Sequence, residues 1–143
     1  MDIYPTILDL LDIDNPENHF IDGHSLRAQL NGEGNHSNKK TFFMHFPHEH
    51  RSSYFTSFRK EEWKLIYHYN PKNPKEPSCE LFNLEKDQSE SHNKAFSKPN
   101  RLASMIESMV HQLEKEGALY PEDINGNALR PFIPKKYLKK IIS

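Results

Sequence analysis

The sequence predicts an α+β domain in which a four-stranded antiparallel sheet packs against one long helix. Between residues 41 and 84, four short aromatic-rich segments follow one another with short links, whereas parallel strands would need long crossovers. After them, apolar residues recur at helical spacing from Pro99 to Gly117. The 143 residues are only 35% hydrophobic, which is low for a self-sufficient globule, but 11% are aromatic, which is enough for a small core.

The first element is a helix over residues 2–11, with Pro5 in its first turn, where the missing N–H is not needed. Its apolar residues fall on one stripe: Ile3, Ile7, Leu10 and Leu11. A turn at 22–26 then leads into a short helical segment that carries Leu26 and Leu30. Because the chain opens inside a structural element, we interpret it as a piece of a longer protein; the alternative is a complete protein with a short N-terminal helix.

The four strands are expected at residues 41–46, 54–59, 63–69 and 80–84. Trp63 is expected to anchor the core with Lys64 facing outward. The last helix buries a stripe of apolar residues and is capped by Gly117; the stripe consists of Leu102, Met105, Ile106, Met109, Val110 and Leu113. The expected organisation is residues 1–40 as a helix with connecting loops, 41–117 as a sheet-plus-helix subdomain, and 118–143 as a solvated or partner-docking tail.

Composition excludes several classes of protein. Lys and Arg number 19 against 20 Asp and Glu, a net charge of −1, whereas proteins that bind nucleic acid usually carry a basic excess. No stretch approaches the roughly 18–20 apolar residues of a membrane span. The single cysteine, Cys79, excludes an internal disulfide framework and is interpreted as a structural thiol.

Three of the nine histidines crowd into residues 45–51, which also contain Glu49 and Arg51. Metal binding is one interpretation, but side chains alternate along a strand, so His48 and His50 could share a face while His45 points away, and Pro47 disturbs the run. A His and Arg cluster at a strand end can instead hold an anion such as sulfate or carboxylate. We therefore expect His45, His48 and Arg51 to bind substrate or another anion, and we expect no metal site. The N-terminal aspartates, Asp2, Asp9, Asp12 and Asp14, are interpreted as solvated.

Five segments, in order, resemble the type I sulfatase family. Residues 2–10 resemble the family's "D-hydrophobic-x-P-T-hydrophobic-L-D-L" helix, 22–26 its "D-G-x-S-L" turn, and 45–48 its "H-x-P-H" strand. Residues 58–66 are similar to "I-R-x-G-D-W-K-L-I" and residues 80–90 to "E-L-Y-N-L-x-x-D-P-x-E". Glu61 and Glu62 replace the family's Gly and Asp, and Gln88 replaces a proline. The resemblance covers residues 2–113 and concerns only the C-terminal portion of the family.

The resemblance implies a fold and an activity. In that family the C-terminal subdomain is a four-stranded antiparallel sheet on a long helix, beside a larger α/β domain. The first helix of this chain would belong to the larger domain. The activity of the family is the hydrolysis of sulfate esters by a formylglycine, which is made from the Cys or Ser of a "C/S-x-P-x-R" motif, with a bound calcium. Cys79 is not followed by that motif, so the nucleophile and the metal ligands would lie in a missing N-terminal catalytic domain.

These observations lead to a functional hypothesis: the chain is the C-terminal part of a sulfatase that acts on a carbohydrate or aryl sulfate. The chain alone would be inactive, and in the whole enzyme it would form one wall of the substrate pocket. Its partners would be the N-terminal catalytic domain of the same polypeptide and a sulfated small molecule or glycan. The resemblance implies a periplasmic or extracellular location. The alternatives are a non-catalytic anion-binding or interaction module, and the same subdomain in a phosphate or phosphonate ester hydrolase.

Overall fold

The computed structural model describes residues 2–33, 41–48, 54–71 and 77–138. By its contacts the chain divides into two compact units, Met1–Lys39 and Lys40–Ser143, which we call the helical unit and the sheet unit. The helical unit contains α1 (Ile3–Leu10) and α2 (Arg27–Leu30). The sheet unit contains β1 (Thr41–Phe46), β2 (Phe55–Lys60), β3 (Trp63–His68), β4 (Cys79–Asn83), α3 (Pro99–Lys115) and α4 (Lys135–Leu138).

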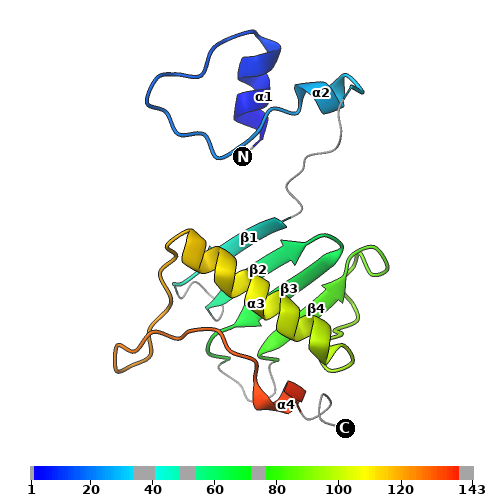
Figure 1. The fold of residues 1–143 in the computed structure, drawn as a ribbon, viewed down its shortest axis with the longest axis vertical. Helices are drawn as coiled ribbons and strands as arrows, with labels where there is room; N and C mark the ends of the chain where they lie inside the picture. Colours follow the sequence, from blue (N-terminus) through cyan, green and yellow to red (C-terminus); the bar gives the residue numbers. More distant parts are fainter. Residues whose placement is uncertain (1, 34–40, 49–53, 72–76, 139–143) are drawn as a thin grey trace. The chain divides into compact units, whose positions relative to one another are not determined.

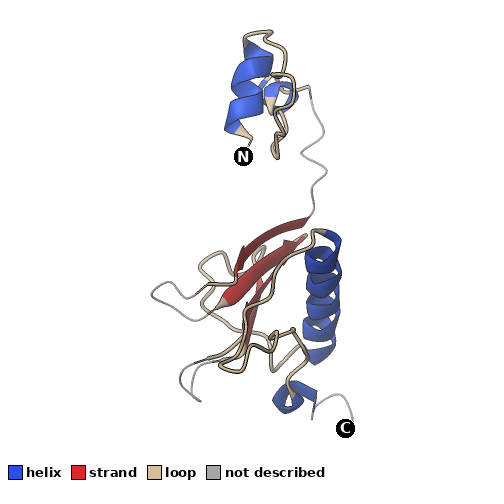
Figure 2. Ribbon diagram, turned by 90° about the vertical axis from the view of Figure 1, so that its left-hand side faces the viewer, coloured by secondary structure: helices blue, strands red, loops and turns tan. Residues whose placement is uncertain are grey.

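The sheet unit confirms the α+β architecture. Its strands lie in the order β1-β2-β3-β4 and every pair is antiparallel. Helix α3 crosses one face of the sheet, and in the described residues no helix covers the opposite face of the sheet unit (Figure 2). The predicted boundaries of the strands differ from the observed ones by at most one residue at either end.

The core lies between α3 and the sheet. Phe58 pairs with Leu65, and Leu65 pairs with Leu81, so these three side chains form a row across the same face. The row packs with five residues of α3, all at most 3% exposed: Leu102, Met105, Ile106, Met109 and Leu113. Each fully buried side chain of this size contributes roughly 1.5–3 kcal/mol of transfer free energy. Trp63 packs against this cluster from its edge, half-buried.

The ends of α3 follow from local chemistry. Pro99 occupies the first turn, where its missing N–H removes no helical hydrogen bond. Gly117 has φ +62°, a left-handed conformation that glycine adopts without steric cost. The N–H of Ala118 then donates to the carbonyl of Leu113 at 2.9 Å, which satisfies one of the free carbonyl groups at the helix end.

The segment after Gly117 differs from the expectation of a solvated tail. It returns along the sheet unit to α4 (Figure 1), and Tyr137 is buried at 2% exposure. The hydroxyl of Tyr137 donates to the carbonyl of Cys79 at 3.1 Å and accepts from the N–H of Cys79 at 3.3 Å. The basic composition predicts solvent exposure, and Lys135 and Lys136 are indeed exposed. The next residue, Tyr137, packs inward instead.

The outer edge of β4 is closed by the chain itself. The side chain of Asn93 accepts from the N–H of Leu81 at 3.1 Å and donates to the carbonyl of Cys79. The N–H of Lys94 donates to the carbonyl of Leu81 at 2.7 Å. Together with Tyr137, these contacts satisfy backbone groups that an edge strand would otherwise leave free to pair with another chain. Cys79 is fully buried, and this burial raises the pKa of its thiol to about 12, as expected of a structural cysteine.

Among the described residues, none of the helices is long and apolar enough to cross a membrane. The apolar stripe of α1 is exposed, with Ile3 at 73%, Ile7 at 50% and Leu11 at 63%. Only Pro5 and Thr6 are buried in that helix. The helical unit, described by itself, therefore buries little of its apolar surface.

Glu61 stands where the resembling sequences have glycine, and it has φ 56°. A side chain in this left-handed conformation costs roughly 1–2 kcal/mol, which glycine avoids at the expense of greater freedom in the unfolded chain. We expect Glu61→Gly to raise the free energy of unfolding by about 0.5–1 kcal/mol, measured by urea unfolding with Trp63 fluorescence. The neighbouring Glu62→Gly is the control and should lower it. Destabilisation of similar size by both variants would contradict this account of the turn.

Candidate functional site

The predicted substrate-binding residues lie at the end of β1. His45 is half-buried and sits in the same cross-strand row as Thr56 and Tyr67, on the face of the sheet that α3 covers. His48 follows Pro47 and is exposed. Arg51, together with His50, lies outside the described residues. The structure therefore locates two of the three predicted residues and places them in different surroundings.

Both ring nitrogens of His45 are engaged within the chain. Nδ1 lies 2.7 Å from Oγ1 of Thr56, and Nε2 lies 2.7 Å from the carbonyl oxygen of Leu119. A carbonyl can only accept a hydrogen bond, so Nε2 carries the proton. In the neutral ring, Nδ1 then accepts from the hydroxyl of Thr56. His45 thereby joins β1 to the segment that follows α3, 74 positions further along the chain.

The hydrogen-bond chain continues to Tyr69, whose hydroxyl lies 2.7 Å from Oγ1 of Thr56. When the ring of His45 is neutral, Thr56 gives its proton to His45, so Tyr69 is the donor to Thr56. Burial raises the pKa of Tyr69 well above its ordinary value, so the phenol stays protonated and able to donate. Tyr120 contacts the rings of His45 and Tyr69 edge-on, and its hydroxyl is buried without a hydrogen-bond partner in the described part of the chain.

His48 has a different environment. Its side chain is exposed, and among the described residues no hydrogen bond or ion pair engages its ring. Of the two predicted substrate-binding histidines, His48 is the one with ring nitrogens available to a ligand. A ring nitrogen of His45 could bind a ligand only after its hydrogen bond to Thr56 or to Leu119 had broken.

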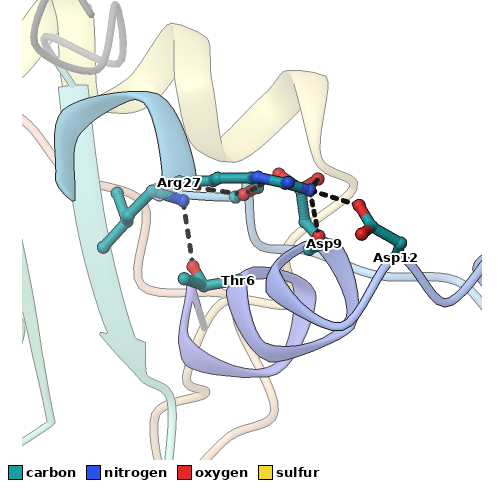
Figure 3. Close-up of polar contacts among 6 residues, drawn as sticks. Thr6, Asp9, Asp12 and Arg27 are labelled. Carbon is teal, nitrogen blue, oxygen red and sulfur yellow. Dashed lines mark hydrogen bonds and ion pairs between the residues drawn. The ribbon is translucent and has the colours of Figure 1, made fainter. Parts of the chain in front are cut away.

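A second polar cluster lies in the helical unit (Figure 3). Asp2, Thr6 and Asp9 recur at helical spacing on one side of α1, and they face the turn at residues 22–27. Asp2 accepts from the N–H of His24 at 3.0 Å, and Thr6 accepts from the N–H of Leu26 at 2.9 Å. These contacts supply partners for backbone N–H groups of a turn that has no sheet or long helix to bond with.

Side chains of the turn also bind to the carboxylates of the first helix and of the residues that follow it. The hydroxyl of Ser25 donates to Asp9, and the guanidinium of Arg27 lies 2.6 Å from Asp12 and 3.2 Å from Asp9 (Figure 3). The hydrogen bond from Ser25 makes the largest contribution to holding the pKa of Asp9 below its usual range, and Arg27 lowers this pKa further. Asp2, Asp9 and Asp12 therefore contact the turn, while the side chains of Asp9 and Asp12 remain 44% and 79% exposed.

The sequence alone does not specify this pairing, because the partners lie 15 to 22 positions apart. The signal that it carries is chemical complementarity, since Asp9 is an acceptor and Ser25 and Arg27 are donors. The cluster holds the turn in place, and its polar groups are already paired with one another.

Among the described residues, no group of three or more His, Cys, Asp or Glu side chains is arranged to hold a metal ion.

Comparison with known proteins places this geometry in context. The family model described as "N-sulphoglucosamine sulphohydrolase, C-terminal" matches residues 1–118. A search of curated proteins found no match. Several solved structures are similar to the chain, each over about a quarter of its own length.

BT4656 in complex with its substrate D-glucosamine-2-N,6-O-disulfate is 23% identical, with a TM-score of 0.58, over 81% of this chain and 24% of its own. BT1596, a 2-O GAG sulfatase, is 21% identical, with a TM-score of 0.60 and the same coverage. A sulfatase candidate from Bacteroides thetaiotaomicron VPI-5482 is 21% identical, with a TM-score of 0.61, again over 81% of this chain and 24% of its own. At these identities the likeness shows the fold.

The His45 contacts predict a stabilising role for its ring. His45→Ala leaves the Leu119 carbonyl and the Thr56 hydroxyl without this partner, and we expect the free energy of unfolding to fall by about 1–3 kcal/mol. His48→Ala is the matched control and should change it by no more than about 0.5 kcal/mol. Urea unfolding followed by Trp63 fluorescence measures both, and equal effects would contradict the assignment.

The lowered pKa of Asp9 predicts acid sensitivity of the helical unit. Its ionised form is stabilised in the folded chain, so this stabilisation is complete above the ordinary carboxyl pKa and is lost as the pH falls through the lowered one. We expect the NMR signals of Ser25 and Arg27 to lose their folded shifts over that acidic range. In Asp9→Asn this titration should be absent, whereas Asp14→Asn, at an exposed position, should retain it. An unchanged profile in Asp9→Asn would exclude Asp9 as the cause.

Proposed function

Because the chain belongs to the N-sulphoglucosamine sulphohydrolase C-terminal family, we propose that it is the C-terminal part of a sulfatase that hydrolyses a sulfate ester of a carbohydrate. The observation that carries the proposal is the match over residues 1–118, which includes the helical unit and, in the sheet unit, the four strands and α3. The fold of the sheet unit agrees with that of the sulfatase structures it resembles.

The choice of a carbohydrate over an aryl sulfate rests on those structures. One is bound to a sulfated glucosamine and another is described as acting on glycosaminoglycans. A sulfated sugar presents anionic oxygens that accept hydrogen bonds, and His and Arg side chains are suitable donors to them. The exposed ring of His48, next to Pro47 at the end of β1, is of this kind.

Within the proposal, the three predicted residues divide into two roles. His48 and Arg51 would donate hydrogen bonds to the sugar or its sulfate. His45 would act as a positioning residue, because its contacts with Thr56 and Leu119 hold the end of β1 from which the His48 segment begins. The sheet unit would thus supply one wall of the substrate pocket.

The chemical step belongs to the rest of the polypeptide in this proposal. Cys79 is fully buried and is not followed by the Pro and Arg of the "C/S-x-P-x-R" motif, so a formylglycine at this position would neither be specified by the motif nor reach a substrate. The formylglycine and the calcium ligands would come from the larger part of the protein, since this chain spans about a quarter of the length of the sulfatases that it resembles.

The test compares the full polypeptide, His48→Ala within it and the 143-residue chain alone, each on glucosamine sulfates and glucosamine phosphates with calcium. We expect the full polypeptide to prefer sulfate and the isolated chain to show no turnover. Loss of a hydrogen bond to a charged group costs roughly 1.5–3 kcal/mol, so His48→Ala should lower kcat/KM by about 10- to 100-fold.

The matched control is His92→Ala, an exposed histidine in the turn after β4, which should leave kcat/KM unchanged. Robust turnover by the isolated chain would contradict the incomplete site, and a preference for phosphate would identify a phosphate ester hydrolase. An unchanged kcat/KM in His48→Ala would remove this residue from the pocket.

A further inference from the structure

Two segments that meet in the sheet unit are rich in basic residues and contain no acidic residue. Residues 92–101 and 131–138 hold five of the chain's 19 Lys and Arg residues and no Asp or Glu. Helix α4, in the second segment, lies beside the beginning of α3, which the first segment enters, in both views of the fold (Figures 1 and 2). The whole chain has a net charge of −1, so this local excess of positive charge does not follow from its overall composition.

Side-chain contacts join the two segments. The ring of Phe96 lies against the ring of Tyr137, with centroids 4.5 Å apart, and Nζ of Lys136 lies 5.3 Å from the centroid of the same tyrosine ring. The hydroxyl of Tyr137 is bonded to the backbone of Cys79. Phe96 and Lys136 are therefore positioned by a ring that is itself anchored to β4.

Four lysines lie within two or four positions of this pair of rings, two on either side of Phe96 and two directly before Tyr137. The N–H of Lys98 donates to the carbonyl of Lys94 at 2.9 Å, which closes a turn around the exposed ring of Phe96, whose exposed fraction is 51%. The four lysines and the phenylalanine form what we call the basic patch: Lys94, Phe96, Lys98, Lys135 and Lys136. Lys94 is half-buried and the other three lysines are exposed.

The basic patch has no counter-charge within the described part of the chain. None of its lysines takes part in an ion pair there. The carboxylate of Glu80, which lies close enough to act on the phenol of Tyr137, is paired with Nε2 of His68 at 2.9 Å. Single exposed charges attract an anion only weakly and are screened by salt, so several of them together favour a ligand that carries more than one negative charge.

We propose that the basic patch binds a second part of a sulfated glycan whose reacting sugar lies at His48. The inference rests on the proposed function for its choice of ligand. Sulfate groups accept hydrogen bonds from lysine, and the apolar C–H groups on one face of a sugar ring can pack on an exposed aromatic ring such as that of Phe96. The preferred substrate is then a chain of sugars and not a single sugar.

The sheet places the basic patch and His48 at the same end but at opposite edges. One row of paired residues runs from His45 on β1 to Cys79 on β4, and the patch is anchored to Cys79 through Tyr137. Neighbouring strands lie about 4.8 Å apart, so these edge strands are separated by roughly 14 Å. A single sugar is too short to span this distance, whereas a short oligosaccharide can reach both edges.

The test reverses charge in the basic patch and measures the binding of heparin, a highly sulfated polysaccharide that contains glucosamine. The patch variant combines Lys135→Glu with Lys136→Glu, at two exposed positions. The matched control combines Lys86→Glu with Lys115→Glu, which makes the same change in net charge at exposed positions after β4 and in the last turn of α3. Dissociation constants are measured for both variants and for the unsubstituted 143-residue chain at low and high salt.

We expect the patch variant to bind heparin about 10-fold more weakly than the unsubstituted chain and the control to stay within about 2-fold, because only charges close to the ligand escape screening. An equal loss in both variants would overturn the inference, since it would trace the effect to net charge. Equal affinity of the unsubstituted chain for heparin and for a DNA duplex, or for vesicles that contain phosphatidylserine, would also overturn it, because the patch would then not select a sulfated glycan.

Kinetics of the full polypeptide separate this inference from the proposed function. The ratio of kcat/KM on heparin oligosaccharides to kcat/KM on glucosamine 6-sulfate should fall about 10-fold in the patch variant and stay unchanged in the control. An active polypeptide in which the patch variant keeps this ratio contradicts the inference and leaves the proposed function standing. A polypeptide without sulfatase activity whose heparin affinity still depends on the patch contradicts the proposed function and supports a glycan-binding surface.

Discussion

The structure depends on the burial of one face of the sheet beneath α3. Phe58, Leu65 and Leu81 form a continuous apolar row across three strands, and the Leu and Met side chains of α3 close over it. Hydrophobic burial is the largest favourable term in a domain of this size. Because one helix can cover only one face, the same arrangement leaves the opposite face to be covered by turns, by the tail or by other parts of a protein.

The segment after α3 shows how side-chain hydrogen bonds complete that core. Its first residues are held to β1 by His45, and Tyr137, near its end, engages the backbone of Cys79 on the opposite edge strand. One continuous segment therefore contacts both edges of the sheet. This explains why a histidine that appeared suited to a ligand is engaged internally, and why His48, two residues beyond β1, has the more exposed ring.

The two units are stabilised by different interactions. The sheet unit has a connected apolar core, whereas the described residues of the helical unit are joined mainly by the polar contacts between α1 and the turn at 22–27. Exposed ion pairs contribute little, commonly below about 1 kcal/mol. A unit held in this way gains most from a surface against which its exposed apolar stripe can pack, which agrees with the proposal that the chain is part of a larger protein.

The sequence by itself determined the order and type of the elements from α1 to α3 and the buried side of α3, because hydrophobic periodicity and turn residues are local signals: the α3 stripe, Gly117 and the four strands all followed from them. Only the tertiary structure decided the partners of the polar residues. His45 bonds to Leu119, Thr6 to Leu26 and Tyr137 to Cys79, pairs that are 74, 20 and 58 positions apart. No local pattern specifies such pairs, since they depend on how the folded elements approach one another. For the same reason, a histidine cluster in the sequence could indicate an anion site but could not show which ring remained available to a ligand.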